Sequence, residues 1–295
     1  MRLVPGDITT PGLGLAEPLS VAGAFHLAAA YDLAVSREVG ERVNVQGTRN
    51  VLRFLADAPG EPQLHYVSTA YVSGDATGTF RETDLDVGQG FKNHYEETKF
   101  LAERAVVESG VPATIYRPGI VVGDSRSGET AKFDGPYFAL RAMERLPSPG
   151  LFIRVGSGAS TLNVVPVDFA VEALARLAAD PASRGRTYHL TDPAPLSVLE
   201  LTRRMAEALE RRLWLVPVPL RLARLALRPR LVRSFLGLPV EALAYFDHPC
   251  DYDCSQATAS LARLGLRCPS LPDYLDRLVA YYRSSRDRVG SEAMT

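Results

Sequence analysis

Apolar runs alternate with segments of helical period along the first two hundred residues. Short apolar runs of this length are typical of strands buried on both faces, and apolar positions three or four apart are typical of helices. The pattern predicts, in order, a strand at 21–29, a helix at 37–58, a strand at 63–69, a helix at 93–110 and a strand at 113–123. Pro59 and Gly110 follow the two helices and end them. This alternation indicates an α/β fold with a parallel sheet.

After residue 124 the pattern changes. It predicts a helix near 136–146, a strand entering a helix at 163–180, and a strand–loop–helix unit at 187–209. Prolines are expected to break the rest into short helices; they are Pro217, Pro219, Pro229, Pro239 and Pro249. We therefore expect a smaller, mostly helical lobe beside the sheet domain. The expected division is 1–124 with 160–194 for the sheet domain, 125–159 with 195–288 for the lobe, and 289–295 for a tail.

Composition excludes several classes of function. The chain has 295 residues, of which 46% are hydrophobic and 23% charged, and its net charge is −1. Such a balance gives no electrostatic reason to expect a nucleic-acid partner. No run approaches the ~18 apolar residues of a membrane span, and no charged and apolar leader opens the chain. We expect a cytoplasmic protein.

The cysteines raise the question of a metal site, because His248, Cys250 and Cys254 lie within seven residues. A closed zinc site takes four ligands, usually with a CxxC or HxxxH pair, and neither pair is present. We expect no metal, and we expect these cysteines and Cys268 to be reduced structural thiols.

Tyr95 and Lys99 are the first candidates for chemistry. They lie four residues apart in a predicted helix, so both side chains project from one face. A tyrosine is a poor acid–base catalyst near neutral pH, and a nearby ammonium lowers its pKa towards the working range. Only three of the 33 basic residues are lysines, so a lysine at this position is more informative than an arginine would be. A surface lysine beside a half-buried tyrosine is the alternative interpretation.

Three further stretches accompany this pair. Ser68 and Thr69 end a predicted strand, where a hydroxyl could hold a substrate carbonyl. The stretch 44–48 places Asn44 and a glycine inside a predicted helix, where each costs about 0.5–1 kcal/mol relative to alanine. The stretch 117–119, Arg-Pro-Gly, stops a strand where ligands gather in doubly wound sheets.

Five motifs together resemble one enzyme family. HLAAAYDL, NVQGTRN, YVSTAYVSG, YEETK and YRPGIVVGDSRSG, in this order and spacing, resemble the extended short-chain dehydrogenase/reductases. YRPGIVVGDSRSG with NVVPVDF further resembles the branch of thioester reductases, fatty acyl-CoA reductases and related epimerase/dehydratase-like proteins. The similarity covers nearly the whole chain. It implies a Rossmann-like doubly wound parallel sheet and hydride transfer between NAD or NADP and a carbonyl carbon.

The resemblance also implies roles for single residues. Tyr95 corresponds to the acid and Lys99 to its partner, which also binds the nicotinamide ribose. Thr69 corresponds to the catalytic Ser/Thr, with Ser68 as the fallback, and Asn44 to an asparagine of the active helix. The positions implied to contact the cofactor are Asp7, Ile8, Leu27, Ala28, Ala29, Tyr31, Lys99, Pro118 and Ile120.

The sequence departs from the family at its start, because no GxxGxxG turn is present. In family terms LVPGDI is the tail of the third strand, and the two βα units that precede this strand in the family, about 60 residues, are absent. The strand at 21–29 should then be an exposed apolar edge. Three explanations stay open: the sequence is part of a longer protein, it is a shortened paralogue, or another chain or a repacked N-terminus fills the gap. Cofactor binding by the chain as written should be weak or absent.

Two classes of function therefore stay open. One is an oxidoreductase acting on an acyl, isoprenoid, sterol or sugar-like carbonyl/alcohol pair, with an epimerase or dehydratase outcome also open. The other is a cofactor-deficient module that binds a partner or a small molecule. The leucine- and arginine-rich stretch 219–239 is expected to be a helical lid with its arginines in water; a membrane-surface helix and an acyl-chain or CoA lid are the alternatives. A homodimer through 37–58 and 94–109 is the expected assembly, if there is one.

Overall fold

The computed structural model describes residues 3–16, 19–156, 158–226, 241–248 and 250–286. The chain divides into two compact units. The first contains residues 1–118, 174–190 and 252–264, and the second contains 119–173, 191–251 and 265–295. These boundaries differ from the expected ones, most clearly because 252–264 joins the first unit. The functions assigned to the two parts stay predictions.

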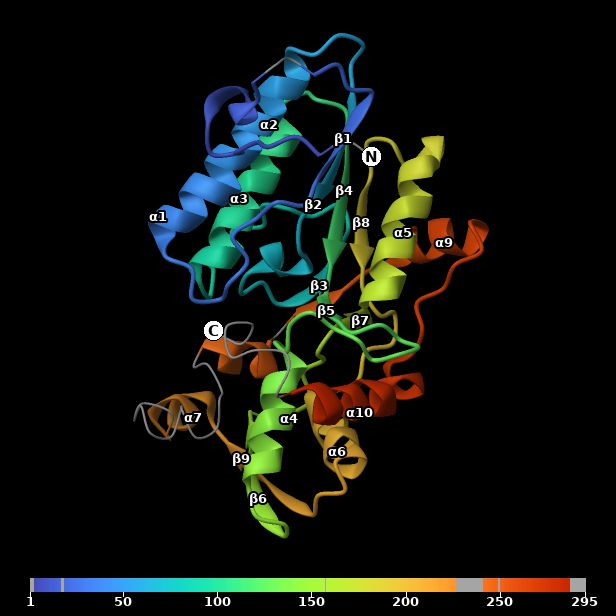
Figure 1. The fold of residues 1–295 in the computed structure, drawn as a ribbon. Coiled ribbons are helices and arrows are strands. Elements are labelled where there is room, and N and C mark those ends of the chain that lie inside the picture. The colour runs from blue at the N-terminus through green and yellow to red at the C-terminus, as the bar shows by residue number, and fades with distance from the viewer. Residues whose placement is uncertain (1–2, 17–18, 157, 227–240, 249, 287–295) are drawn as a thin grey trace. The chain divides into compact units, whose positions relative to one another are not determined.

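The first unit is built on a parallel sheet of four strands in the order β1-β2-β4-β8. The strands are β1 (Gly23–His26), β2 (Gln63–Val67), β4 (Ala113–Pro118) and β8 (Thr187–Leu190). Its helices are α1 (Arg37–Gly40), α2 (Gly47–Ala56), α3 (His94–Glu108), the second half of α5 (Val167–Ala179) and α9 (Ser255–Arg263). Figure 1 shows α2 and α3 on one face of the sheet and α9 on the other. The expected Rossmann-like α/β fold is confirmed.

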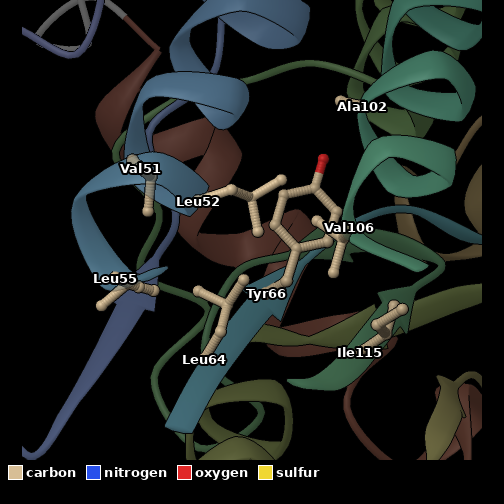
Figure 2. Close-up of a cluster of buried hydrophobic side chains, with 8 residues drawn as sticks. All are labelled: Val51, Leu52, Leu55, Leu64, Tyr66, Ala102, Val106 and Ile115. Atoms are coloured by element: carbon tan, nitrogen blue, oxygen red, sulfur yellow. The ribbon is translucent and has the colours of Figure 1, made fainter. Parts of the chain in front are cut away.

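The core of this unit lies between the sheet and the helices α2 and α3 (Figure 2). Leu64 and Tyr66 project from β2 towards Leu52 and Leu55 of α2, and all four are buried. Alternate residues of a strand face one side, so this burial fixes which residues of β2 point towards α3. By the same alternation Ser68, two residues after Tyr66, also points towards α3.

Two of the predicted elements differ from those observed in their ends or in their continuity. The predicted helix 37–58 spans Arg37–Ala56, but residues Glu41–Gln46 form a π-helical turn between α1 and α2. The predicted strand 113–123 is wrong as one element. It splits at Gly119 into β4 and β5 (Ile120–Val122), because the chain passes so close to Asn163 that a Cβ on Gly119 would stand 2.7 Å from its carbonyl oxygen.

The edge position of the first strand is confirmed. Among the described residues β1 has one neighbour, β2, and Phe25 and Leu27 are 55% and 60% exposed. The expectation of a strand tail at LVPGDI is wrong, since residues 3–8 enter no strand. They turn back on themselves and lie along α2, where the Asn50 amide donates to the Ile8 carbonyl at 2.8 Å. The backbone of this segment is thus bonded by a side chain of α2, where a strand would be bonded by the backbone of its neighbour.

The second unit is less helical than expected. Two parallel strand pairs, β5 with β7 (Val164–Pro166) and β6 (Gly150–Val155) with β9 (Leu213–Val218), accompany its helices. The helices are α4 (Pro136–Arg145), α6 (Val198–Ala208), α7 (Leu220–Ala226) and α10 (Leu275–Ser285). The prediction of short helices is wrong at 213–218, since this segment forms the strand β9. Pro217 is tolerated there because β9 pairs with β6 alone, so the backbone N–H groups on its other edge need no partner strand.

Short elements complete the described chain. They are β3 (Gly78–Phe80), β10 (Cys250–Tyr252) and short 3₁₀ helices at Pro11–Gly14, Ala70–Ser73, Pro181–Ser183, Glu241–Asp247 and Leu271–Asp273. Cys250, Cys254 and Cys268 are free thiols. In the part of the chain described, no helix has both the length and the apolar character needed to cross a bilayer. Most of the predicted lid at 219–239 and the predicted tail at 289–295 lie outside the described residues.

Candidate functional site

Tyr95 stands in the first turn of α3, and the sequence makes this turn stable. The Asn93 side chain accepts from the Glu96 amide at 2.9 Å and caps the helix. Tyr95 is half-buried, and its ring meets the ring of Tyr31 edge-on with centroids 6.3 Å apart. Tyr31 is 55% exposed in the loop after β1. The structure thus brings together two predicted site residues that are 64 positions apart.

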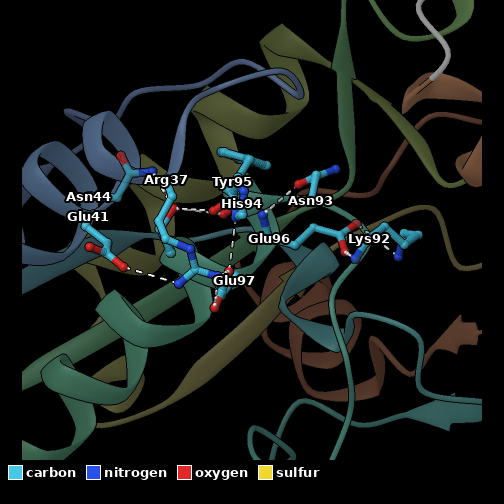
Figure 3. A network of polar contacts seen from close by, with 10 residues as sticks. Arg37, Glu41, Asn44, Lys92, Asn93, His94, Tyr95, Glu96 and Glu97 are labelled. Carbon is cyan, nitrogen blue, oxygen red and sulfur yellow. Dashed lines mark hydrogen bonds and ion pairs between the residues drawn. The ribbon is translucent and has the colours of Figure 1, made fainter.

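Ion pairs bind α1 to the start of α3 beside Tyr95 (Figure 3). Arg37 contacts Glu41 at 3.3 Å and Glu97 at 2.9 Å, and His94 lies 3.2 Å from the same Glu97 carboxylate. These side chains are partly exposed, so each pair is worth little stability by itself. Together they hold α1 against the first turn of α3, where Tyr95 lies.

Lys99 lies one turn after Tyr95, and its ammonium is buried at the end of β2. It donates to the Val67 carbonyl at 2.8 Å and to the Tyr66 hydroxyl at 3.0 Å. Burial lowers the pKa of Lys99 to about 8, while the Glu103 carboxylate acts in the opposite direction. Burial also raises the pKa of Tyr66 well above its usual value, so Tyr66 stays a neutral phenol. The cation is fixed at the carboxyl end of the sheet.

The two candidate hydroxyls have different surroundings. Ser68 follows Tyr66 on the helix-facing side of the strand and donates to the Glu103 carboxylate. Thr69 caps a 3₁₀ turn by accepting from the Tyr71 amide at 3.3 Å. A Ser68 hydroxyl committed to a carboxylate has no second proton to donate to a substrate, whereas the Thr69 hydroxyl keeps its proton.

Glu103 was not found by sequence reasoning. It is fully buried and also receives Nε and a terminal nitrogen of Arg117 at 2.9 and 2.6 Å. Arg117 in turn lies 3.2 Å from His189, whose pKa burial lowers to about 3. The available signal was spacing: Glu103 follows Lys99 by four residues, so Tyr95, Lys99 and Glu103 form one stripe on α3.

Asn44 acts on the backbone of the loop after β1. Its amide accepts from the Ala30 N–H at 2.7 Å and donates to the Ala30 carbonyl at 3.2 Å. It also donates to Thr98 at 3.0 Å, one residue before Lys99. The π-helical turn that contains Asn44 is a rare geometry, often found at functional sites. In this structure Asn44 is a positioning residue for the loop and for α3.

The remaining unusual residues of that helix also have structural partners. Gly47 lets the N-terminal segment approach, because a Cβ there would stand 2.8 Å from Ile8 Cδ1. Thr48 lies 3.0 Å from Nε2 of His26, the last residue of β1. Burial, and the charge of Lys99, lower the pKa of His26 to about 4, so it is neutral near pH 7. Sequence reasoning missed His26, although its place at a strand end was a signal.

The predicted cofactor positions fall into three groups. Leu27, Ala28 and Tyr31 are exposed and Ala29 is half-buried, in the loop that Asn44 holds. Asp7 and Ile8 form a turn against α2, where the Thr9 amide holds the pKa of Asp7 below its usual value and Ile8 packs into the core. Pro118 ends β4 in the first unit and Ile120 begins β5 in the second; both are half-buried. Contact with a cofactor stays a prediction for all of them.

Comparison with known proteins assigns the chain to a family. The model of an NAD-binding family described as male sterility protein matches residues 1–174. The chain belongs to this family. A crystal structure of the terminal R domain from the myxalamid PKS-NRPS biosynthetic pathway superimposes with a TM-score of 0.78 at 25% identity, covering 96% of this chain and 75% of that one.

The curated relatives that this chain matches are longer than the chain itself. A non-canonical nonribosomal peptide synthetase, FrzA, from a Cladobotryum species is 28% identical over 62% of this chain and 18% of its own length. The fatty acyl-CoA reductase wat of Drosophila melanogaster is 28% identical over 62% of this chain and 42% of its own. The alignments thus cover less than half of these relatives.

Proposed function

We propose that this male sterility family chain carries the catalytic part of an NAD(P)H-dependent reductase acting on a carbonyl carbon, with an acyl thioester or the derived aldehyde as substrate. The observation that carries the proposal is the stripe of Tyr95 and Lys99 on α3, set at the carboxyl end of β2 beside Thr69. The substrate class is supported by the fatty acyl-CoA reductase relative.

The described residues fit the nicotinamide end of the cofactor better than its pyrophosphate. Tyr31 exposes its ring next to Tyr95, Leu27 is exposed in the same loop, and Lys99 holds a cation at the carboxyl end of the sheet. The sequence supplies no GxxGxxG turn for the phosphates. We therefore assign the nicotinamide end to these residues and expect weak binding by this chain alone.

The roles of the chain's own groups follow from their chemistry. A reduced nicotinamide held by these residues would supply a hydride to the carbonyl carbon. Thr69 donates a hydrogen bond to the carbonyl oxygen, and Tyr95 gives that oxygen its proton as the carbonyl double bond becomes single. With a thioester substrate the resulting hemithioacetal then breaks its C–S bond, which releases the thiol and leaves the aldehyde. Lys99, one turn away, stabilises the resulting phenolate through its charge. Asn44 and Glu103 act indirectly, by holding the loop after β1 and the end of β2.

The test is oxidation of NADPH or NADH, followed by absorbance, with a long-chain acyl-CoA or fatty aldehyde as substrate. Tyr95→Phe should lower turnover by about 10²–10⁴-fold, while Tyr281→Phe, in α10 of the second unit, should leave it unchanged. Equal turnover in Tyr95→Phe would overturn the mechanism. Tight aldehyde binding without any NAD(P)H binding or turnover would instead support the non-catalytic binding module.

A further inference from the structure

The strand pair β6–β9 presents one large apolar face to the surface. Leu151 and Ile153 of β6 pair in register with Trp214 and Val216 of β9. These four side chains are 62%, 45%, 63% and 38% exposed. The alternate residues Phe152 and Leu215 are more buried, so the ribbon has an inner and an outer side. Leu151, Ile153, Trp214 and Val216 are called the ribbon face below.

A face of this kind is unusual on a soluble protein. Exposed apolar residues are ordinary when scattered, but four large ones side by side mark an interaction site. The face includes the one tryptophan of the chain. Tryptophan is enriched where a protein meets a lipid headgroup region, because its ring is apolar and its N–H is polar.

The charge of the chain next to β9, and of Arg212 in particular, selects the partner. The described segment 203–226, which contains β9, carries six arginines and two glutamates, in a chain whose net charge is −1. Arg212 is exposed, and its carbonyl accepts from the Gly150 amide at 3.0 Å, which continues the ladder by one residue. Strand alternation places Arg212 on the same side as Trp214. Apolar side chains bordered by arginine are complementary to an anionic lipid surface.

The size of the face argues against a second copy of the chain. Each partner of a stable dimer buries about 800 Å², and four side chains supply roughly half of that. In β9, Pro217 removes a backbone donor that pairing with another strand would use. Shallow insertion between lipid headgroups needs neither a larger area nor a free strand edge.

We propose that the ribbon face docks the protein onto an anionic phospholipid surface, with Trp214 inserted among the headgroups and Arg212 against their phosphates. This docking is independent of the proposed reductase activity. It also goes beyond what the sequence pattern indicated, since no membrane contact was expected from 213–218.

Trp214 makes the test specific, because all tryptophan fluorescence of the chain comes from this face. We expect its emission to shift to shorter wavelength with phosphatidylglycerol-containing vesicles and not with pure phosphatidylcholine vesicles. Leu151→Ser should weaken vesicle partitioning about tenfold. Arg212→Glu should do so as well, and Val171→Ser, at a position 63% exposed in α5, should not.

Three results would overturn the proposal. One is an unchanged emission with both kinds of vesicle. The second is a shift that depends on protein concentration without vesicles, which would assign the face to a second copy. The third is equal partitioning of Arg212→Glu and the unmodified chain. Arg212 is exposed, so this last comparison stays informative even where Leu151→Ser lowers stability.

Discussion

The side-chain amide of Asn44 pairs with the backbone of Ala30 as a second peptide group would, accepting from its N–H and donating to its carbonyl. This pair ties the π-helical turn to the loop that carries Leu27, Ala28, Ala29 and Tyr31. Because Asn44 also donates to Thr98, the loop and the start of α3 share one anchor. The position of Tyr31 against Tyr95 depends on that anchor.

Replacing Asn44 with alanine should therefore loosen the loop without changing Tyr95 or Lys99. We expect a loss of about 1–3 kcal/mol in the free energy of unfolding, because the partly buried Ala30 groups lose their partner. Urea denaturation measures the loss, and faster proteolysis between 27 and 36 would locate it. Asn44→Asp keeps the acceptor but sets a buried carboxylate against the Ala30 carbonyl, so it should be destabilised as well. Equal stability of Asn44→Ala and the unmodified chain would contradict the anchoring role.

The buried pair of Glu103 and Arg117 gives a second prediction. Glu103→Gln should cost about 3–5 kcal/mol of unfolding free energy, because it leaves the Arg117 guanidinium uncompensated in the core. The double variant Glu103→Leu with Arg117→Met should recover a large part of that loss. Thermal and urea midpoints of the three proteins check this. A double variant less stable than Glu103→Gln would argue against an ion-pair effect.

His26 predicts how stability depends on pH. Its folded pKa of about 4 lies below the ordinary value of 6.5, so the unfolded state binds more protons between these two pH values. Stability should therefore rise from about pH 4 to 6.5, by about 3 kcal/mol from this residue. His189, lowered to about 3, adds a slope of the same sign.

The control for this prediction is His26→Gln, which removes one titrating group and keeps a polar partner for Thr48. Its unfolding free energy should change less steeply between pH 4 and 6.5, while the slope above pH 7 stays the same. An unchanged slope in the lower window would mean that His26 is protonated at its ordinary pKa in the folded protein.

Lys99 predicts the alkaline limit of activity. Its pKa of about 8 means that the ammonium loses its proton as pH rises through 8, and with it the charge that favours the Tyr95 phenolate. Turnover should fall above about pH 8. Arginine keeps its charge to much higher pH. Any activity that Lys99→Arg retains should therefore not fall above pH 8. The same fall in turnover above pH 8 in both proteins would mean that a group other than Lys99 causes it.

Much of the fold was predictable because it rests on local patterns. Apolar period and helix-ending residues placed α3 and β2 within a few residues, and the spacing of Tyr95 and Lys99 put both on one face of α3. The strand at 213–218 was missed for a local reason as well. Two prolines within a few residues resemble a helix-breaking loop, and only pairing with β6 makes the segment a strand.

The sequence by itself determined the α/β alternation and the placing of Tyr95 and Lys99 on one face of α3, because these depend on residues at most a few turns apart. The exposed edge at β1 was expected from the family resemblance. The tertiary structure alone decided that Ser68 binds Glu103, that Asn44 holds Ala30, and that Trp214 shares a face with Leu151. Each of these pairs is separated by 14 to 63 positions. Spacing along a chain carries no information about such contacts, since they exist only when the sheet and its helices bring distant segments together.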